Sequence, residues 1–374
     1  MKDTGHREAV EAALRFEKTD RTPVNNFALV TAARSNGILV KDARYDPEIS
    51  ARVSVDYAMR TESDFVKPVV DSQIPFLDMG MDVRFPDDDY GSVHSKIVSE
   101  PEDVDKLAFF DPSVAKECPH FTRCFVDALE ETARILPEDL HICGLAWGPI
   151  TTAGYLMGVE DMLMALMMGN EEMVKKLVSK CARFVADQQI RMVDAGSTVM
   201  WMADPTSSCD IISPDMFGPF SAFAVKDAIS RVRKDYDIPS FLHICGNTRP
   251  IIPEVAETGA DCLSFDHAVP AKVAKEHRPD SVHHAGDPGI GHRGMLQDHR
   301  RGRYGGRVHP RPRLRDAHLL PGRERPRHGP CGKGILEDPV ITGSSGGLQS
   351  RYAYQDEGYG RHLLPTYTLV IQDT

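Results

Sequence analysis

Apolar positions follow two alternating patterns along the first three quarters of the chain. Longer stretches, with apolar residues three and four positions apart, predict helices at Glu160–Met168, Glu171–Ala195, Pro214–Lys234 and Arg249–Thr258. Between and around them, short apolar runs predict strands at Asp64–Val70, His141–Trp147, Thr198–Ala203, Ser240–Cys245, Cys262–Asp266 and Ser281–Ala285. Repeated strand and helix units predict a parallel sheet that is covered by helices.

A (β/α)8 TIM barrel fits this alternation best, so we predict an α/β fold of that class. Ahead of the first strand, the amphipathic spacing of Arg7–Phe16 predicts an N-terminal helical extension that closes one end of the barrel. An open doubly wound sheet is the alternative, but no Gly-X-Gly-X-X-Gly motif follows the first predicted strand. In a barrel the active site lies at the carboxyl-terminal ends of the strands, so residues there are the candidates for function.

The last quarter of the chain has a different character. Residues 291–330 contain eleven Arg, no Lys, three acidic residues and five His, and no helix or strand period persists there. We therefore predict a barrel domain over residues 1–285 and an irregular Arg-rich region over 286–374 in place of the last barrel strands. Arg, His, Pro and Gly have GC-rich codons, so a GC-rich gene read in the wrong frame explains this composition. A basic RNA-binding tail is the alternative.

Charge and composition narrow the class of protein. The net charge of −11 makes a general nucleic-acid surface unlikely, because phosphate contacts need clustered cations. The sequence has no run of about 18 apolar residues, so we expect no membrane span. The charged N-terminus does not resemble a signal peptide, and the eight cysteines are scattered without a Cys-X-X-Cys pair. These features predict a cytoplasmic protein with reduced thiols. They do not predict an oligomeric state.

The strongest candidate for chemistry is the segment Phe241–Thr248. His243 and Cys245 are two positions apart, so on a strand both side chains project from the same face. An imidazole and a thiolate on one face provide two of the three protein ligands that a catalytic zinc site uses, with its fourth position open. A buried and inert pair is the alternative, because free cysteine is among the most buried residue types. Asn247 and Thr248 follow with polar side chains that suit a ligand or a helix cap.

The same four residue types occur earlier in the chain, at His141–Gly144. This copy continues into the small and apolar segment Leu145–Pro149, which predicts a core strand rather than a metal site. The chain therefore contains an internal control for its own candidate site.

Five blocks of sequence, in a fixed order, resemble successive motifs of the uroporphyrinogen decarboxylase superfamily. The resemblance extends over about residues 5–285, and the order of the blocks makes it far more specific than any single block. The blocks are Trp147–Gly154, Ala203–Pro205, Ile212–Phe217, His243–Thr248, and Glu257–Asp261 with Phe265–Asp266.

Within that superfamily, His243 and Cys245 are similar to the zinc-binding pair of the methylcobamide:coenzyme M methyltransferases. The resemblance implies that zinc holds the acceptor thiol as a thiolate, which attacks the methyl group of a methylated corrinoid. It also implies that a partner protein presents the corrinoid, and that Trp147 and Asn247 contact this cofactor.

Two carboxylates end strands near the expected barrel mouth. The resemblance implies that Asp204 and Asp266 are catalytic, by hydrogen bonding to a zinc ligand or to the substrate. For each, capping of a loop backbone is the structural alternative. In the family the third zinc ligand comes from a late Gly-Cys motif, and the corresponding region here is the Arg-rich one. Cys331 is the only cysteine after Cys262 and is our candidate third ligand, with Cys209 as a substitute.

The sequence thus predicts a zinc-dependent enzyme that transfers a methyl group between a corrinoid and a small thiol such as coenzyme M. One rival is the opposite half-reaction, in which a methylated substrate gives its methyl group to the corrinoid. A uroporphyrinogen decarboxylase is a second rival, disfavoured because Thr22–Leu29 has no arginine where true decarboxylases have an Arg-rich motif. A third is an inactive, truncated barrel with exposed apolar edges.

Overall fold

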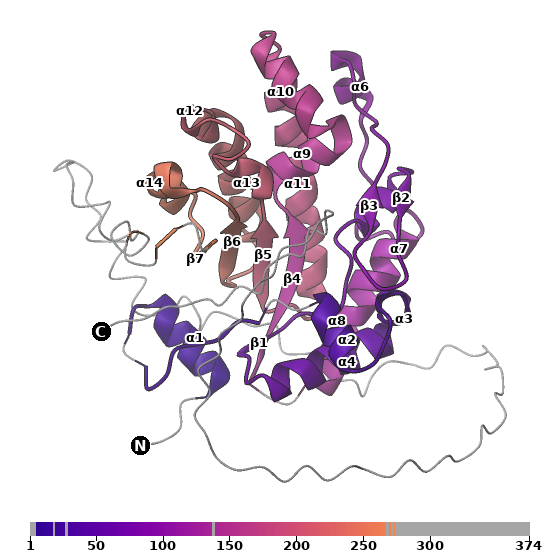
Figure 1. The fold of residues 1–374 in the computed structure, drawn as a ribbon, viewed down its shortest axis with the longest axis vertical. Helices are drawn as coiled ribbons and strands as arrows, with labels where there is room; N and C mark the ends of the chain where they lie inside the picture. Colours follow the sequence, from indigo (N-terminus) through magenta and orange to yellow (C-terminus); the bar gives the residue numbers. More distant parts are fainter. Residues whose placement is uncertain are drawn as a thin grey trace, which may run out of the picture. The chain divides into compact units, whose positions relative to one another are not determined.

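A curled parallel sheet forms the centre of the protein (Figure 1). The computed structural model describes residues 5–17, 19–26, 29–136, 139–266, 269–270 and 273, all of which belong to one compact unit. Five strands run parallel in the order β1-β4-β5-β6-β7. Each lies within a predicted strand, which confirms the α/β class. The sixth predicted strand, Ser281–Ala285, and the region 286–374 lie outside the described residues.

The strands of the parallel sheet are β1 (Phe65–Val66), β4 (His141–Trp147), β5 (Val199–Ala203), β6 (Ser240–Ile244) and β7 (Cys262–Phe265). A separate antiparallel pair consists of β2 (Val83–Arg84) and β3 (Ser92–Val93). The helices before β4 are α1 (His6–Leu14), α2 (Leu29–Ser35), α3 (Val40–Tyr45), α4 (Pro47–Arg60), α5 (Ile74–Asp78), α6 (Pro101–Lys106), α7 (Pro119–Phe121) and α8 (Asp127–Ile135). The later helices are α9 (Pro149–Met157), α10 (Val159–Met167), α11 (Glu171–Asp194), α12 (Pro214–Phe217), α13 (Phe223–Val232) and α14 (Ile252–Ala256).

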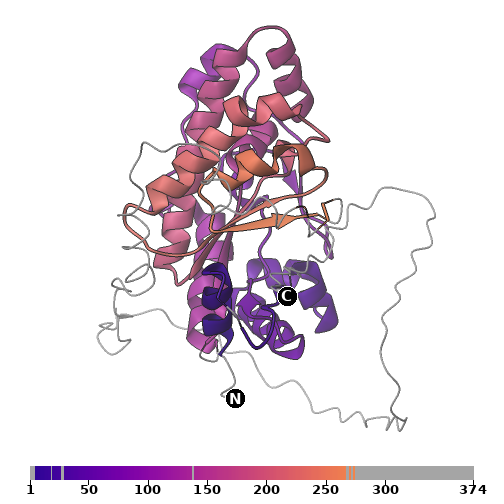
Figure 2. The ribbon, with the colours of Figure 1, turned by 90° about the vertical axis from the view of Figure 1, so that its left-hand side faces the viewer.

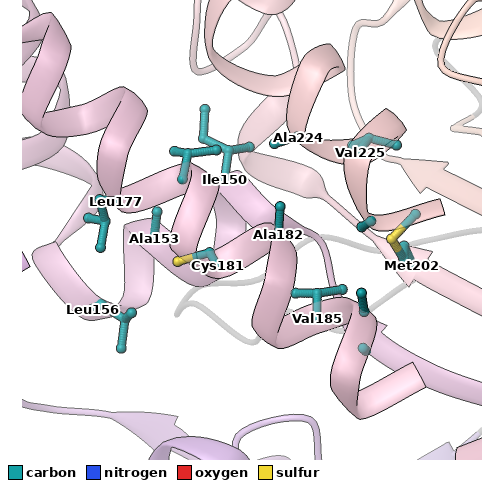
Figure 3. Close-up of a cluster of buried hydrophobic side chains, with 14 of the residues drawn as sticks. Ile150, Ala153, Leu156, Leu177, Cys181, Ala182, Val185, Met202, Ala224 and Val225 are labelled. Atoms are coloured by element: carbon teal, nitrogen blue, oxygen red, sulfur yellow. The ribbon is translucent and has the colours of Figure 1, made fainter. Parts of the chain in front are cut away.

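The two faces of the sheet pack into different apolar clusters, as alternation along a strand requires. One face packs against α9, α11 and α13, and Figure 3 shows Met202 of β5 among residues of these helices. The other face is the concave interior, where Leu145, Trp201 and Phe241 gather. A side chain can therefore be assigned to the helix layer or to the interior from its parity along the strand.

Register places four residues at one level on the interior face. Trp147 pairs with Ala203, Ala203 with His243, and His243 with Ser264. These residues stand at or next to the carboxyl-terminal ends of their strands, where barrels build active sites. We call this set the mouth layer.

Four helices, α1–α4, precede β1 and form an N-terminal extension; α1 is the predicted helix Arg7–Phe16, and α2–α4 were not predicted. In Figures 1 and 2 they lie at the opposite end of the sheet from α10. Val10 of α1 joins the interior cluster, and His6 Nδ1 lies 2.7 Å from the buried carboxylate of Asp64 just before β1. Arg44 of α3 forms a fully buried ion pair with Asp71, with 3.1 Å between Nε and Oδ2. These contacts fix the extension to the first strand.

Three predicted elements differ from the structure. In the predicted helix Arg249–Thr258, Arg249–Ile251 form a 3-10 turn and only Ile252–Ala256 are α-helical. The predicted helix Pro214–Lys234 is interrupted by a π-helical turn at Gly218–Ala222, because Pro219 has no N–H for the helical hydrogen bond. The predicted strand Asp64–Val70 contributes only β1 to the sheet, because Pro68 has no N–H that could donate a hydrogen bond to a neighbouring strand. None of the described helices is long and apolar enough to cross a membrane.

Candidate active site

His243 and Cys245 lie at the carboxyl-terminal end of β6, on the interior side. His243 is the fourth residue of the strand and has the same parity as Phe241, which packs in the interior cluster. Cys245 follows the last strand residue and is partly exposed, whereas His243 is buried. The structure therefore brings the predicted pair to the position where a barrel holds its reactive groups.

Burial gives His243 a neutral imidazole at physiological pH. Burial, and then the charge of Lys67, lower the pKa of His243 to about 4. Its Nδ1 lies 3.0 Å from Ser264 Oγ on the adjacent strand β7. A hydrogen bond to one ring nitrogen orients the other as a metal ligand in known metal sites. The neutral ring is also the protonation state that metal binding needs.

Cys245 is protonated in the metal-free chain. Burial raises the pKa of its thiol, and the carboxylate of Asp266 raises it further. Asp266 follows β7 and its Oδ2 accepts a hydrogen bond of 3.0 Å from the backbone N–H of Gly246. A cation at this position would lower the pKa of the Cys245 thiol, because it favours the thiolate. His243 and Cys245 thus supply two donors whose surroundings suit a zinc ion, short of the three protein ligands that a catalytic zinc site uses.

The loop after Cys245 is fixed by a second carboxylate. Asp210, in the loop after β5, accepts a hydrogen bond of 2.9 Å from the N–H of the exposed Asn247. Gly246 has a φ of +76°, and a Cβ there would lie 2.3 Å from Asp210 Oδ2. Only glycine fits this close approach without strain. Asp210 therefore supports the segment that holds Cys245.

Trp147 stands in the mouth layer at the end of β4. Its Nε1 donates a 3.2 Å hydrogen bond to Gln73 Oε1, and Gln73 Nε2 donates in turn to the hydroxyl of Tyr155 at 3.2 Å. The indole is partly exposed and fixed in orientation. Its predicted contact with a corrinoid, like that of Asn247, remains a prediction.

Asp204 is fully buried and its contacts match the capping alternative. It follows the interior residue Ala203, so its side chain has the parity of the helix layer. Oδ1 accepts from the N–H of Thr151 in the first turn of α9 at 2.9 Å, and Oδ2 accepts from Ser207 Oγ at 3.0 Å. A Cβ at Gly148 would lie 2.2 Å from Asp204 Cγ, so glycine permits this contact. The catalytic role of Asp204 stays a prediction.

The structure adds a charged interior residue that the sequence analysis missed, Lys67. It has the parity of Phe65, is 7% exposed, and its Nζ lies 3.7 Å from the ring centroid of Trp201. Burial lowers the pKa of Lys67 to about 7. The sequence offers one signal for it, since Lys67 is a charged residue that directly follows the apolar pair Phe65–Val66 in a predicted buried strand.

The first His-Ile-Cys copy is a core strand, as predicted. His141 is the first residue of β4, at the end opposite to the mouth layer, and stacks on Phe65 with 5.6 Å between ring centroids. Burial lowers the pKa of His141 to about 3 and raises that of Cys143 to about 11. The two copies share their residues but occupy opposite ends of their strands.

The structure does not test the predicted third zinc ligand. Cys331 lies outside the described residues. Within the described part of the chain, no three His, Cys, Asp or Glu side chains form a group able to hold a metal ion, so Cys209 does not complete one with His243 and Cys245.

The curled parallel sheet and the helices that cover it belong to the α/β barrel class, and the His-X-Cys pair lies at the end of that sheet where barrels have their active sites. The family model for uroporphyrinogen decarboxylase (URO-D) matches residues 6–289, and the chain belongs to this family. A solved methyltransferase from Methanosarcina mazei has the same fold, with a TM-score of 0.62 and 20% identity over 73% of this chain and 81% of that chain. Together these confirm the predicted TIM-barrel fold.

Several curated relatives share parts of the sequence. A methylcobamide:CoM methyltransferase, MtbA, from Methanosarcina acetivorans is 25% identical over 74% of this chain and 80% of its own length. A methylated-thiol–coenzyme M methyltransferase from Methanosarcina mazei is 30% identical, but the match covers 37% of this chain and 36% of that protein. A uroporphyrinogen decarboxylase from Synechococcus is 25% identical over 74% of this chain and 80% of its own length.

Proposed function

We propose that the protein is a zinc-dependent methyltransferase that moves a methyl group from a methylated corrinoid to a small thiol such as coenzyme M. The observation that carries the proposal is the position of His243 and Cys245 at the mouth of the barrel, beside Asp266. The similarity to MtbA, which is named for this reaction, supports it.

His243 and Cys245 would hold the zinc ion, with Cys331 as the proposed third ligand. Bound zinc would lower the pKa of an acceptor thiol at its open position, so that a thiolate exists near neutral pH. Ser264 fixes the ring of His243 through Nδ1, which makes Nε2 the proposed ligand atom. Asp266 holds the Cys245 loop through the N–H of Gly246.

The transfer forms a sulfur–carbon bond and breaks a cobalt–carbon bond. The electron pair of the broken bond stays on cobalt, and the thiol proton passes to solvent. The interior residues contribute by position, because holding sulfur and methyl carbon in line replaces an encounter in solution. A partner protein that presents the corrinoid would meet the barrel at the mouth layer, where Trp147 and Asn247 are our proposed contacts.

The test follows the loss of methyl–cobalt absorbance when the zinc-loaded full chain, methylcobalamin and coenzyme M are mixed. We expect thiol-dependent demethylation, lowered by at least about 100-fold in Cys245→Ala, since a zinc ligand is lost. Cys143→Ala is the matched control, because it changes the same motif at the other end of a strand. Equal rates in all three proteins, or no dependence on the thiol, would contradict the proposal.

The opposite half-reaction is the second candidate. The relative named for methylated thiols favours it, although that match spans about a third of the chain. Methylation of cob(I)alamin by a methylated thiol, faster than demethylation of methylcobalamin, would select this direction. The decarboxylase hypothesis has a structural difficulty, since Arg21, the arginine nearest to Thr22–Leu29, is bound to Asp64 by a 2.9 Å contact.

A further inference from the structure

One buried amide binds two aromatic rings at the edge of the mouth layer. Gln73 is the residue before α5, and its side chain is buried. Its Oε1 accepts a 3.2 Å hydrogen bond from Trp147 Nε1, and its Nε2 donates a 3.2 Å hydrogen bond to the Tyr155 hydroxyl. The indole N–H can only donate, so it requires the amide oxygen on its side and fixes which way the amide lies. Gln73 therefore joins Trp147 of β4 to Tyr155 of α9, whose rings pack at 5.7 Å between centroids.

The backbone of Gln73 is held by a buried ion pair. Its N–H donates a 3.1 Å hydrogen bond to Oδ1 of Asp71, and Oδ2 of Asp71 accepts from Arg44 Nε at 3.1 Å and from the N–H of Gly91 at 2.7 Å. Arg44 belongs to α3 of the N-terminal extension, and both charged side chains are buried. None of these side chains has a buried polar atom without a partner, and such a network rigidifies the residues that form it. A continuous series of hydrogen bonds thus runs from the extension to Trp147.

Trp147 shares its level in the mouth layer with His243. Ala203 pairs with both residues, so the backbones of Trp147 and His243 are about 10 Å apart, which is two strand spacings. The indole packs against the interior cluster and is partly exposed. It therefore forms one side of the mouth, within reach of a molecule that is held at His243 and Cys245.

We propose that Gln73 is a positioning residue, which holds the Trp147 indole in one rotamer as a preformed side of the mouth. The inference rests on the proposed function, and it adds a residue outside the mouth layer that sets the affinity for the methylated corrinoid. A side chain that is already fixed loses no rotamer freedom on binding, whereas a free one does, which weakens binding by about threefold to tenfold. Gln73 acts through Trp147 and needs no contact with the reactants.

The fluorescence of Trp147 tests the positioning without catalysis. The chain has two tryptophans, so Trp201→Phe gives a background protein in which only Trp147 emits. In that background we expect Gln73→Leu to shift the emission to longer wavelengths and to increase acrylamide quenching, because the indole loses its partner and gains contact with solvent. Tyr155→Phe keeps the bond between Gln73 and Trp147 and should change the emission less. Gln73→Glu should keep the emission of the background protein, because a carboxyl oxygen still accepts from Nε1.

Gln189→Leu is the matched control. Gln189 is also a buried glutamine, and its Nε2 donates hydrogen bonds to the carbonyl oxygens of Gly144, at 3.2 Å, and Trp201, at 2.9 Å. Its loss should lower the free energy of unfolding as the loss of Gln73 does, but leave the emission of Trp147 unchanged. Urea unfolding curves establish that each variant is folded. Emission and quenching in Gln73→Leu that equal those of this control overturn the positioning role.

Methyl-transfer kinetics of the zinc-loaded full chain, without the Trp201 substitution, then measure the consequence at the site. We expect Gln73→Leu to raise the KM for methylcobalamin by about threefold to tenfold and to change kcat less than about twofold, the pattern of a loss shared by ground state and transition state. Gln73→Glu and Gln189→Leu should keep the wild-type KM. A displaced indole with an unchanged KM overturns the claim that Gln73 sets the affinity, and leaves the proposed function intact. A displaced indole in proteins that show no methyl transfer refutes the proposed function, and leaves the positioning of Trp147 by Gln73.

Discussion

Asp204 offers a sharp test because a cap and a catalytic carboxylate respond differently to the same substitutions. Asp204→Ala removes the acceptor for the buried N–H of Thr151 and for the hydroxyl of Ser207. A buried donor left without its acceptor costs about 1–3 kcal/mol. The Ser207 hydroxyl can turn to Ser221 Oγ, 2.6 Å away, so most of the loss comes from Thr151. We expect a decrease of about 1–3 kcal/mol in the free energy of unfolding.

Asp204→Asn separates the two roles. Its amide oxygen still accepts from Thr151 N–H, and its amide nitrogen can donate to Ser207 Oγ, so we expect a loss of about 1 kcal/mol or less. Urea unfolding of the metal-free proteins measures both variants, and the methylcobalamin assay measures activity. An Asp204→Ala variant within about 0.5 kcal/mol of the wild type would refute the capping argument. A stable Asp204→Asn protein with a rate lowered more than about 100-fold would assign Asp204 to catalysis.

Three further predictions follow from buried charge and backbone geometry. Because the pKa of Lys67 is about 7 in the folded chain, below the ordinary lysine value of 10.5, the unfolded chain binds the extra proton between these two values. The stability of the wild type relative to Lys67→Met should therefore rise with pH across this window, by at most about 4–5 kcal/mol, and a flat difference in urea unfolding would contradict the burial. Gly246→Ala should lower the zinc affinity, because the added Cβ displaces Asp210. Gly37→Ala is the control, since Gly37 has a φ of +67° and nothing lies within 4 Å of the added Cβ, so that it imposes similar backbone strain without such a contact. Equal zinc affinity in the two variants would contradict the role of the Asp210 loop. Arg44→Met should cost about 3–5 kcal/mol in thermal or urea unfolding by leaving Asp71 buried and unpaired, and a neutral effect would show that Asp71 is protonated or hydrated instead.

The strands of the sheet were predictable because they are apolar on both faces. β4 and β6 are buried along nearly their whole length, so their sequences form continuous apolar runs. The β2–β3 pair was not predicted, because two-residue strands carry no period. The interruption at Gly218–Ala222 was not predicted, because the apolar spacing on both sides of Pro219 is that of one continuous helix.

The sequence predicted only those site residues that lie close together along the chain. His243 and Cys245 were found because metal ligands two apart on a strand are a local pattern. Lys67 and Ser264 were missed, since their roles depend on which face of the sheet is the interior, and register between distant strands sets that face. Asp204 is ambiguous from sequence for the same reason, because its parity is known only once Ala203 is placed.

Zinc content of the purified protein tests the central claim most directly. The wild type and His141→Ala should each hold about one zinc ion per chain after dialysis, because His141 lies at the far end of its strand. His243→Ala should lose most of the metal, with an affinity lowered at least about tenfold. Equal zinc in all three proteins would contradict the account, since the metal would then be bound elsewhere.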